Sequence, residues 1–179
     1  VVDARTDAPL RAGVVRQYQE EDVLRFSTPN DVNPTVRTDT EGRFALPVTA
    51  GAIRLRVDLP DGRIHLEDPV DMPADGALSE QLIRVGNFGG IAGRLLDATG
   101  RPLAGEAIRT MHFGPGGYAE DSTDTDAGGE FAFADLTAGD YFVSHVIRAD
   151  GQELQTSTVQ VRVRNGVVSH VTLQPTGSA

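Results

Sequence analysis

The chain contains two copies of one sequence pattern, and this internal repeat constrains its fold more than any other feature. Residues 38–46 read Thr-Asp-Thr-Glu-Gly-Arg-Phe-Ala-Leu, and residues 125–133 read Thr-Asp-Ala-Gly-Gly-Glu-Phe-Ala-Phe. Further matches flank these motifs in the same order: Val2-Asp3-Ala4 with Leu96-Asp97-Ala98, and Ala50-Gly51 with Ala138-Gly139. Each copy is long enough to hold a core of its own. The repeat therefore predicts two domains, 1–85 and 86–179, joined near the glycine-rich residues 86–90.

Short strands separated by turn residues account for most of each copy. Arg54–Leu59 alternates polar and apolar residues, and Val159–Arg164 does the same, which is the period of a strand with one buried face. Asn165-Gly166 predicts a hairpin turn before Val167–Leu173, because both residues tolerate positive φ. No window carries a capped apolar stripe of helical period. The sequence predicts an all-β fold.

The composition excludes several classes of chemistry. All 16 basic residues are arginine, against 26 acidic ones, and the chain has no cysteine. Without cysteine there is no disulfide, thiolate nucleophile or cysteine-based zinc site, and without lysine there is no Schiff base. A net charge of −10 repels nucleic acid phosphates. No stretch approaches the roughly 18 apolar residues that span a bilayer. We therefore expect neither a nucleic-acid partner nor a membrane-spanning segment.

The second copy carries a longer motif with several spaced elements. They are Gly93, Asp97, Gly100, Pro102-Leu103-Ala104-Gly105, Thr125-Asp126, Gly129, Phe131, Phe133, Leu136, Ala138-Gly139, Tyr141 and Val171-x-Leu173. This pattern resembles the carboxypeptidase regulatory-like family, which belongs to the transthyretin-like (prealbumin-like) β-sandwiches and is related in architecture to the B-type repeats of bacterial adhesins. The first copy keeps fewer of these elements. The resemblance implies two tandem Ig-like/transthyretin-like antiparallel β-sandwiches of about seven strands each, arranged as a rigid rod.

The motif residues have structural roles that need no ligand. In each copy we expect an Asp carboxylate to cap a tight turn, at Asp39 and Asp126, and the glycine three residues later, Gly42 or Gly129, to take positive φ. Phe44 and Phe131 are then expected to re-enter the core. Tyr141 resembles a buried tyrosine that fixes the start of a strand. The motif thus specifies a fold.

Two groups of residues suggest metal binding at first sight. Asp124, Asp126 and Asp135 partly match the spacing of an EF-hand calcium loop, but Gly128 supplies no side-chain oxygen and helices are missing on both sides. The hairpin turn is the favoured account of these residues. The four histidines, His65, His112, His145 and His170, have no ligand spacing, and the repeat places His145 at an inward position, where we expect it buried and hydrogen-bonded. We predict no metal site and no cofactor.

An enzymatic role is not supported by the residues. Ser144-His145 and Ser169-His170 are adjacent in strands, so their side chains point to opposite faces. The chain lacks the iron-ligand pattern of the intradiol dioxygenases and the terminal motif of the purine-breakdown hydrolases, which share this sandwich. The isopeptide crosslink of adhesin repeats requires a lysine, which is absent. We predict no catalytic and no cofactor-binding residues.

The remaining candidates concern binding and assembly. Tyr18, Phe26, Phe113 and Tyr118, in or beside loops, are the aromatic residues that a carbohydrate site would use, although local packing is the favoured interpretation. The first copy begins two residues before Asp3, so its first strand is short compared with Gly90–Leu96 of the second copy. Either the chain is part of a longer protein, or a neighbour donates the missing strand.

These observations favour a non-enzymatic structural or interaction module of a secreted or cell-surface protein. Its partners would be flanking domains of a longer chain or neighbouring subunits, with a protein or a glycan as a ligand. The extracellular or cell-surface location rests on the resemblance, because members of this family mostly lie outside the cell. Two alternatives stay open: a subunit of an extracellular filament or surface layer assembled by β-strand donation, and an accessory carbohydrate- or calcium-binding domain of a secreted hydrolase.

Overall fold

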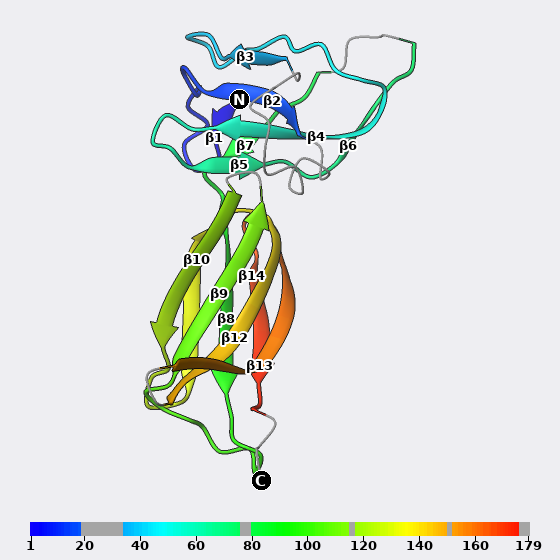
Figure 1. Ribbon diagram of the computed structural model, residues 1–179. Coiled ribbons are helices and arrows are strands. Elements are labelled where there is room, and N and C mark those ends of the chain that lie inside the picture. Colours follow the sequence, from blue (N-terminus) through cyan, green and yellow to red (C-terminus); the bar gives the residue numbers. More distant parts are fainter. Residues whose placement is uncertain (19–33, 76–79, 115–116, 150–151, 176–179) are drawn as a thin grey trace. The chain divides into compact units, whose positions relative to one another are not determined.

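The regular structure of the chain is entirely β-strand over the residues that the computed structural model describes, which are 1–18, 34–75, 80–114, 117–149 and 152–175. The chain divides into two compact units, Val1–Asn87 and Phe88–Ala179 (Figure 1). Within the described ranges, no helix is long and apolar enough to cross a membrane. The all-β prediction is confirmed.

The second unit is a sandwich of two sheets. Its strands are β8 (Gly89–Leu95), β9 (Ala107–Gly114), β10 (Gly117–Asp124), β11 (Glu130–Leu136), β12 (Gly139–Ala149), β13 (Gln152–Val163) and β14 (Val168–Leu173). One sheet has the order β10-β9-β12-β13 and the other β11-β8-β14. All neighbours are antiparallel except β8 and β14, which are parallel from Val168↔Gly90 to Leu173↔Leu95. The first and last strands of this unit are therefore paired side by side.

The core of the second unit lies between its two sheets. Alternate residues of the strands face inward, as the pleat requires. The buried cluster consists of Ile91, Leu95, Ile108, Phe131, Phe133, Tyr141, Val143, Val161, Val163 and Leu173. The rings of Phe131 and Phe133 meet edge to face, with centroids 6.1 Å apart. Fully burying such a side chain stabilises the fold by roughly 1.5–3 kcal/mol.

The Asp residues of the motif cap tight turns, as predicted. The Oδ1 atom of Asp126 accepts hydrogen bonds from the backbone N–H groups of Gly128 and Glu130, both at 2.8 Å, and Gly129 has φ of 70°. Asp39 caps the matching turn of the first unit in the same way. The backbone N–H groups of Arg43 and Glu41 lower the pKa of Asp39, because they stabilise the ionised carboxylate.

Tyr141 holds the start of β12 against the preceding turn. Its hydroxyl donates a hydrogen bond to the Thr137 carbonyl at 3.0 Å, and its burial raises the pKa of the phenol to about 12. Its ring stacks on His112, with centroids 4.3 Å apart. A Cβ at Gly139 would lie 2.5 Å from the His112 ring, so glycine is needed beside it. The predicted role of Tyr141 is confirmed.

The first unit repeats this topology with shorter strands. They are β1 (Val2–Asp3), β2 (Val14–Tyr18), β3 (Thr35–Arg37), β4 (Gly51–Asp58), β5 (Ile64–Leu66), β6 (Val70–Met72) and β7 (Arg84–Val85). The sheet β3-β2-β4-β5, with β6 also pairing with β4, corresponds to β10-β9-β12-β13. Strands β1 and β7 are parallel, as β8 and β14 are. The sequence repeat is therefore a repeat of strand order.

Two local predictions were wrong. The Asn165-Gly166 turn is tight, and Gly166 has φ of 69°, but it joins strands of different sheets: β13 pairs with β12, and β14 with β8. The chain changes sheets here because β14 pairs in parallel with β8. The turn packs closely on Gly89, where a Cβ would lie 2.4 Å from the Arg164 carbonyl oxygen.

Phe44 does not re-enter the core as Phe131 does. It is only partly buried, and residues 43–50 form no strand. The matching strand, β11, is held in place by its pairing with residues 89–94 of β8. Residues 43–50 belong to no sheet among the described residues, so they lack such a pairing there.

We predict that crowding makes Gly129 far less replaceable than Gly100. Both have positive φ, so alanine at either position costs roughly 1–2 kcal/mol for the backbone alone. A Cβ at Gly129 would also lie 2.7 Å from the Leu95 carbonyl oxygen, whereas one at Gly100 meets nothing within 4 Å. Gly129→Ala should destabilise the chain by at least about 1 kcal/mol more than Gly100→Ala, measured by urea unfolding followed by circular dichroism. Equal losses would contradict this account of the turn.

Candidate interaction face of the second unit

The outer face of the β10-β9-β12-β13 sheet carries side chains that the core does not use. Along β9, Ile108, Thr110 and His112 are buried, so the alternation directs Arg109 and Phe113 outward. Cross-strand pairing adds the residues opposite them to the same face. Tyr118 of β10 pairs with Phe113, Glu120 of β10 and Phe142 of β12 both pair with Met111, and Ser122 of β10 pairs with Arg109.

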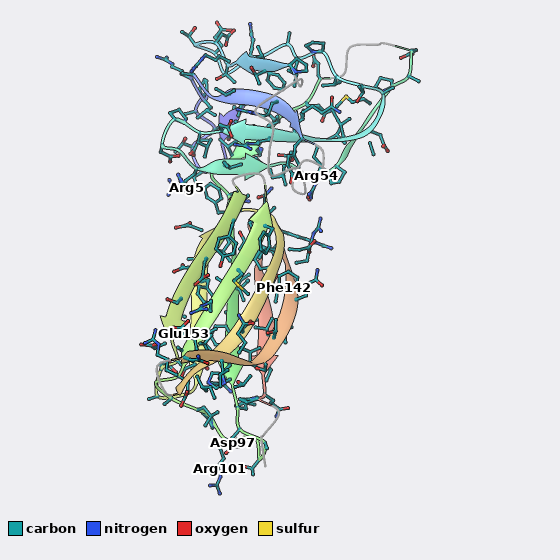
Figure 2. All side chains as sticks on the ribbon, viewed as in Figure 1. Arg5, Arg54, Asp97, Arg101, Phe142 and Glu153 are labelled. Carbon is teal, nitrogen blue, oxygen red and sulfur yellow. The ribbon has the colours of Figure 1, made fainter. Side chains whose placement is uncertain are left out.

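One end of this face is an aromatic patch, formed by Met111, Phe113, Tyr118 and Phe142. The exposed fractions of the three aromatic side chains are 48% for Phe113, 49% for Tyr118 and 37% for Phe142. The rings of Phe113 and Tyr118 are tilted by 49°, with centroids 5.2 Å apart. Figure 2 shows Phe142 on the strand next to β9. The patch therefore extends over three neighbouring strands.

A row of alternating charges continues from the patch along the same face, made of Glu120, Arg109, Glu153 and Arg148. The Tyr118 hydroxyl donates to the Glu120 carboxylate, whose Oε1 lies 3.1 Å from Nε of Arg109. Arg109 Nη2 then donates to Glu153, and Arg148 Nε donates to the other oxygen of Glu153 at 3.1 Å. Each charge of the row is thus neutralised by a neighbour.

These contacts shift the titration of the groups involved. Hydrogen bonds from Arg109 and then Arg148 lower the pKa of Glu153, and the bond to Glu153 raises the pKa of Arg109. The hydrogen bond to the Glu120 carboxylate raises the pKa of the Tyr118 phenol, because it favours the protonated hydroxyl. These pKa shifts favour an ionised Glu153 carboxylate, a charged Arg109 guanidinium and a protonated Tyr118 hydroxyl at neutral pH.

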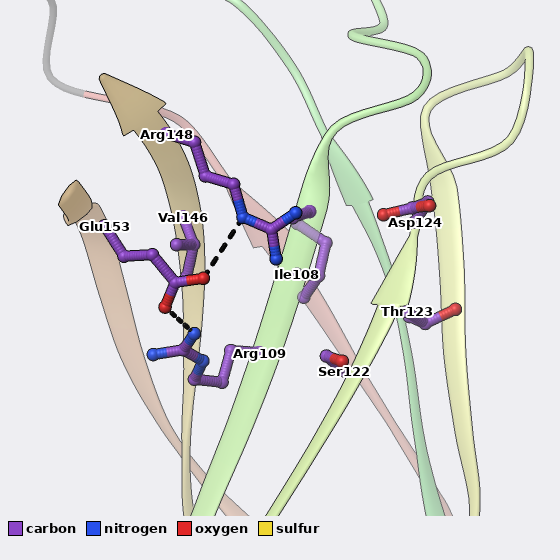
Figure 3. Close-up of a pocket in the computed structure, with 9 residues that line it drawn as sticks. Ile108, Arg109, Ser122, Thr123, Asp124, Val146, Arg148 and Glu153 are labelled. Atoms are coloured by element: carbon purple, nitrogen blue, oxygen red, sulfur yellow. Dashed lines mark hydrogen bonds and ion pairs between the residues drawn. The ribbon is translucent and has the colours of Figure 1, made fainter. Parts of the chain in front are cut away.

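A shallow pocket of about 150 Å³ opens beside the charge row (Figure 3). Its polar walls are supplied by Arg109, Arg148, Glu153, Ser122, Thr123 and Asp124, and the apolar part by Ala107, Ile108 and Val146. In Figure 3 the guanidinium groups of Arg109 and Arg148 reach Glu153 from two strands. The pocket therefore has hydrogen-bond donors and acceptors next to one another in its wall.

The structure separates the three Asp residues with calcium-loop spacing. Asp126 caps its turn, Asp124 lies in β10 beside the pocket, and Asp135 lies at the far end of β11, five residues beyond Glu130. An extended strand of that length carries Asp135 roughly 16 Å from the turn. Across the described ranges, no three His, Cys, Asp or Glu side chains come together as a metal site would require.

The histidines have separate structural surroundings. His145 is buried and hydrogen-bonded, as predicted: Nδ1 lies 2.6 Å from Thr156 Oγ1, and Nε2 lies 3.1 Å from the Glu106 carboxylate. His65 is buried, with Nε2 2.9 Å from the Glu67 carboxylate. His112 stacks on Tyr141, and His170 is exposed on β14.

The aromatic candidates also divide. Tyr18 is buried in β2, and Phe26 lies outside the described residues. Phe113 and Tyr118 lie near the facing ends of β9 and β10, beside the connection between these strands. Phe142 and the charge row were not predicted from the sequence. The strand period of residues 107–114 and 117–124 was the available signal, because it places every second residue of both strands on one face.

We predict that Arg109 controls the titration of Glu153. In the intact chain the Glu153 carboxyl should titrate below its ordinary range, and Arg109→Gln should move its pKa upward, toward that range, because the stronger of its two donors is lost. Carbon-13 NMR of the carboxyl groups against pH measures both. Arg101→Gln is the matched control, since Arg101 is exposed and lies in a turn away from Glu153. An unmoved Glu153 pKa in Arg109→Gln would contradict the geometry of the row.

Several pilins are among the known structures with similar folds. The chain is 15% identical to the minor pilin of Streptococcus agalactiae, with a TM-score of 0.47, over 96% of this chain and 87% of the pilin. It is 17% identical to a streptococcal ancillary pilin (TM-score 0.42, 97% and 60% covered) and 12% identical to a variant of the shaft pilin of Lactobacillus rhamnosus GG (TM-score 0.36, 100% and 93% covered). At these identities and scores, the similarities do not indicate what this chain does.

A comparison with curated proteins finds no match. The family comparison matches residues 90–174, which run from β8 to just beyond β14, and the matched model is that of the carboxypeptidase regulatory-like domain. The turn, core and strand-start residues described above are the elements that carried this resemblance in the sequence. The second unit of this chain is therefore a carboxypeptidase regulatory-like domain.

Proposed function

We propose that the chain is a non-enzymatic structural and interaction module of a secreted or cell-surface protein, and that its β-sandwich units carry tension along the chain. The observation that carries this proposal is the parallel pairing of first and last strands, β8 with β14 and β1 with β7. Because paired parallel strands run in one direction, the chain enters the second unit at Gly89 and leaves it at Leu173, at opposite ends of the same strand pair.

This pairing determines how a pulling force acts on the second unit. A force along the chain slides β14 against β8, so the hydrogen bonds of all six register pairs from Val168↔Gly90 to Leu173↔Leu95 resist together. A force that separates the same strands from one end would break these bonds one after another. In the observed topology, a force along the chain loads the β8–β14 hydrogen bonds together in shear, which is the arrangement that a load-bearing spacer needs.

The non-enzymatic part of the proposal is supported by what the motif residues do. Asp39, Asp97 and Asp126 are engaged in capping turns, and Tyr141 is bonded to a backbone carbonyl. Of the buried histidines, His65 contacts the Glu67 carboxylate and His112 contacts the Asp140 carbonyl rather than a nucleophile. His145 lies between the Thr156 hydroxyl and the Glu106 carboxylate. The proposed location outside the cell is supported by the family that the second unit matches.

We predict that the second unit resists force in a direction-dependent way. The chain has no cysteine, so two introduced cysteines define the pulling points uniquely. Handles at Asn87→Cys and Gln174→Cys load β8 and β14 in shear, whereas handles at Ala98→Cys and Gln174→Cys pull the same pair apart from one end. All three positions are exposed, so the handles leave the core intact. Single-molecule pulling should give a several-fold higher unfolding force for the first pair, and equal forces would contradict a load-bearing role.

A second candidate, assembly by strand donation, is favoured by one observation in the first unit. Residues 43–49 alternate between exposed and partly buried side chains, as a strand does, but they belong to no sheet among the described residues. Their counterpart β11 pairs with β8. An extended segment from a neighbouring subunit could pair with residues 43–48 in its place.

The two candidates predict different masses in solution. A load-bearing module in one chain should stay at 19.1 kDa by light scattering after size-exclusion chromatography, whatever its concentration. Strand donation between copies requires the mass to grow with concentration. A mass that grows would favour the filament candidate, and a constant monomer mass would eliminate donation between copies of this chain.

A further inference from the structure

We propose that the outer face of the β10-β9-β12-β13 sheet binds a neutral glycan, with the aromatic patch stacking against sugar rings and the charge row bonding to their hydroxyl groups. This inference deepens the interaction role proposed above and rests on it. It is independent of the load-bearing role, because the strands loaded in shear, β8 and β14, belong to the other sheet.

The aromatic patch is larger than local packing requires. The pairing of Phe113 with Tyr118 is a cross-strand contact of the kind that stabilises a hairpin. It does not account for Phe142, which lies on β12 and is 37% exposed. Exposed apolar side chains that are scattered singly need no explanation, whereas a contiguous group of them is a feature of binding surfaces. The patch therefore offers flat apolar rings to a ligand from three strands.

The charge row determines which ligands the patch can accept. Glu120 and Glu153 are matched by Arg109 and Arg148 through direct contacts, so the row is neutral as a whole. A polyanion would meet these carboxylates on a chain whose net charge is −10, and a polycation would have to displace the arginines. Carboxylates and guanidinium groups side by side instead suit hydroxyl groups, each of which donates and accepts hydrogen bonds.

The patch, the row and the pocket together have the length of an oligosaccharide site. Phe113 and Ala107 lie at the two ends of the outward row of β9, which spans roughly 20 Å. Ser122, Thr123 and Asp124 line the pocket at the far end and add oxygen atoms that can bond to sugar hydroxyls. A chain of sugar rings could contact aromatic side chains at one end and polar ones at the other.

An extended peptide is the competing occupant, and the geometry does not favour it. A peptide that adds as a strand uses the backbone groups at a sheet edge, here β10 or β13, and gains specificity from side chains along that edge. The features described above instead run across the face, from β10 over β9 to β12. Phe142 lies on β12, an interior strand of the sheet, and not on an edge strand. A contribution of Phe142 to binding therefore distinguishes a ligand that lies across the face from a peptide added at an edge.

Binding can be followed through the tyrosines of the chain. There is no tryptophan, and of the three tyrosines Tyr18 and Tyr141 are buried while Tyr118 is half exposed. We would titrate the full chain with neutral oligosaccharides of glucose, mannose, xylose and N-acetylglucosamine, and with acidic and basic peptides as alternatives. The expected result is a saturable change in tyrosine fluorescence with at least one oligosaccharide, measured in parallel by isothermal titration.

The variants test the patch and the pocket separately. Tyr118→Ala and Phe142→Ala should each weaken binding by about ten-fold, which corresponds to one lost ring contact. Tyr118→Phe keeps the ring and should weaken binding less than Tyr118→Ala. Ser122→Trp fills the pocket from an exposed strand position, so it should weaken binding even if an alanine variant fails to fold. Val168→Ala, an exposed apolar residue of the opposite sheet, is the control and should change nothing.

Three results would overturn the proposal. One is the absence of binding by every neutral oligosaccharide, measured with the folded chain. Another is binding that Tyr118→Ala, Phe142→Ala and Ser122→Trp leave unchanged. The third is binding of peptides alone, which would assign the face to a protein partner. None of these results bears on the pulling experiment, so failure of this inference is distinguishable from failure of the load-bearing role.

Discussion

The close approach of strands around β8 is the constraint on which the second unit depends. A Cβ at Gly93 would lie 2.4 Å from the ring of Phe131 and 2.7 Å from the Val171 carbonyl oxygen, and one at Gly89 would meet the Arg164 carbonyl oxygen at 2.4 Å. Glycine in the interior of a strand ordinarily weakens it. Here it lets β8 pair with β11 and β14 while the phenylalanines of β11 and the turn after β13 pack onto it.

This arrangement is also the source of the resistance to force that we propose for the chain. The sequence has neither the lysine of an isopeptide bond nor cysteine. The resistance must therefore come from the hydrogen bonds between β8 and β14 and from the core that holds the two strands together. In the first unit the equivalent pair, β1 with β7, has only two register pairs, Val2↔Arg84 and Asp3↔Val85. The two units are alike in strand order and different in the extent of this pairing.

Local patterns in the sequence predicted local structure well. The alternation at Arg54–Leu59 and Val159–Arg164, the Asp-capped turns and the anchoring of Tyr141 all depend on residues close together in the chain. Pairing partners depend on distant residues. The residues Asn165-Gly166 predicted the turn, but they carry no information on the pairing partner of the next strand. That strand, β14, pairs with β8 rather than with β13. Phe44 and Phe131 occupy the same motif position, and only the pairing of β11 with β8 distinguishes their burial.

The candidate site was hard to predict for a related reason. A strand that buries Ile108, Thr110 and His112 must turn Arg109, Met111 and Phe113 outward, but the residues that meet them there come from β10, β12 and β13. Phe142 and Glu153 join the face only through pairing across the sheet.

The same pairing separates two tasks. In the proposed load-bearing role, force along the chain would be carried by β8 and β14, whereas the proposed glycan contacts lie on the sheet of β9, β10, β12 and β13. Because a ligand on that outer face touches neither loaded strand, tension below the unfolding force should leave the binding face unchanged. A module built in this way could hold its ligand while the chain is under load.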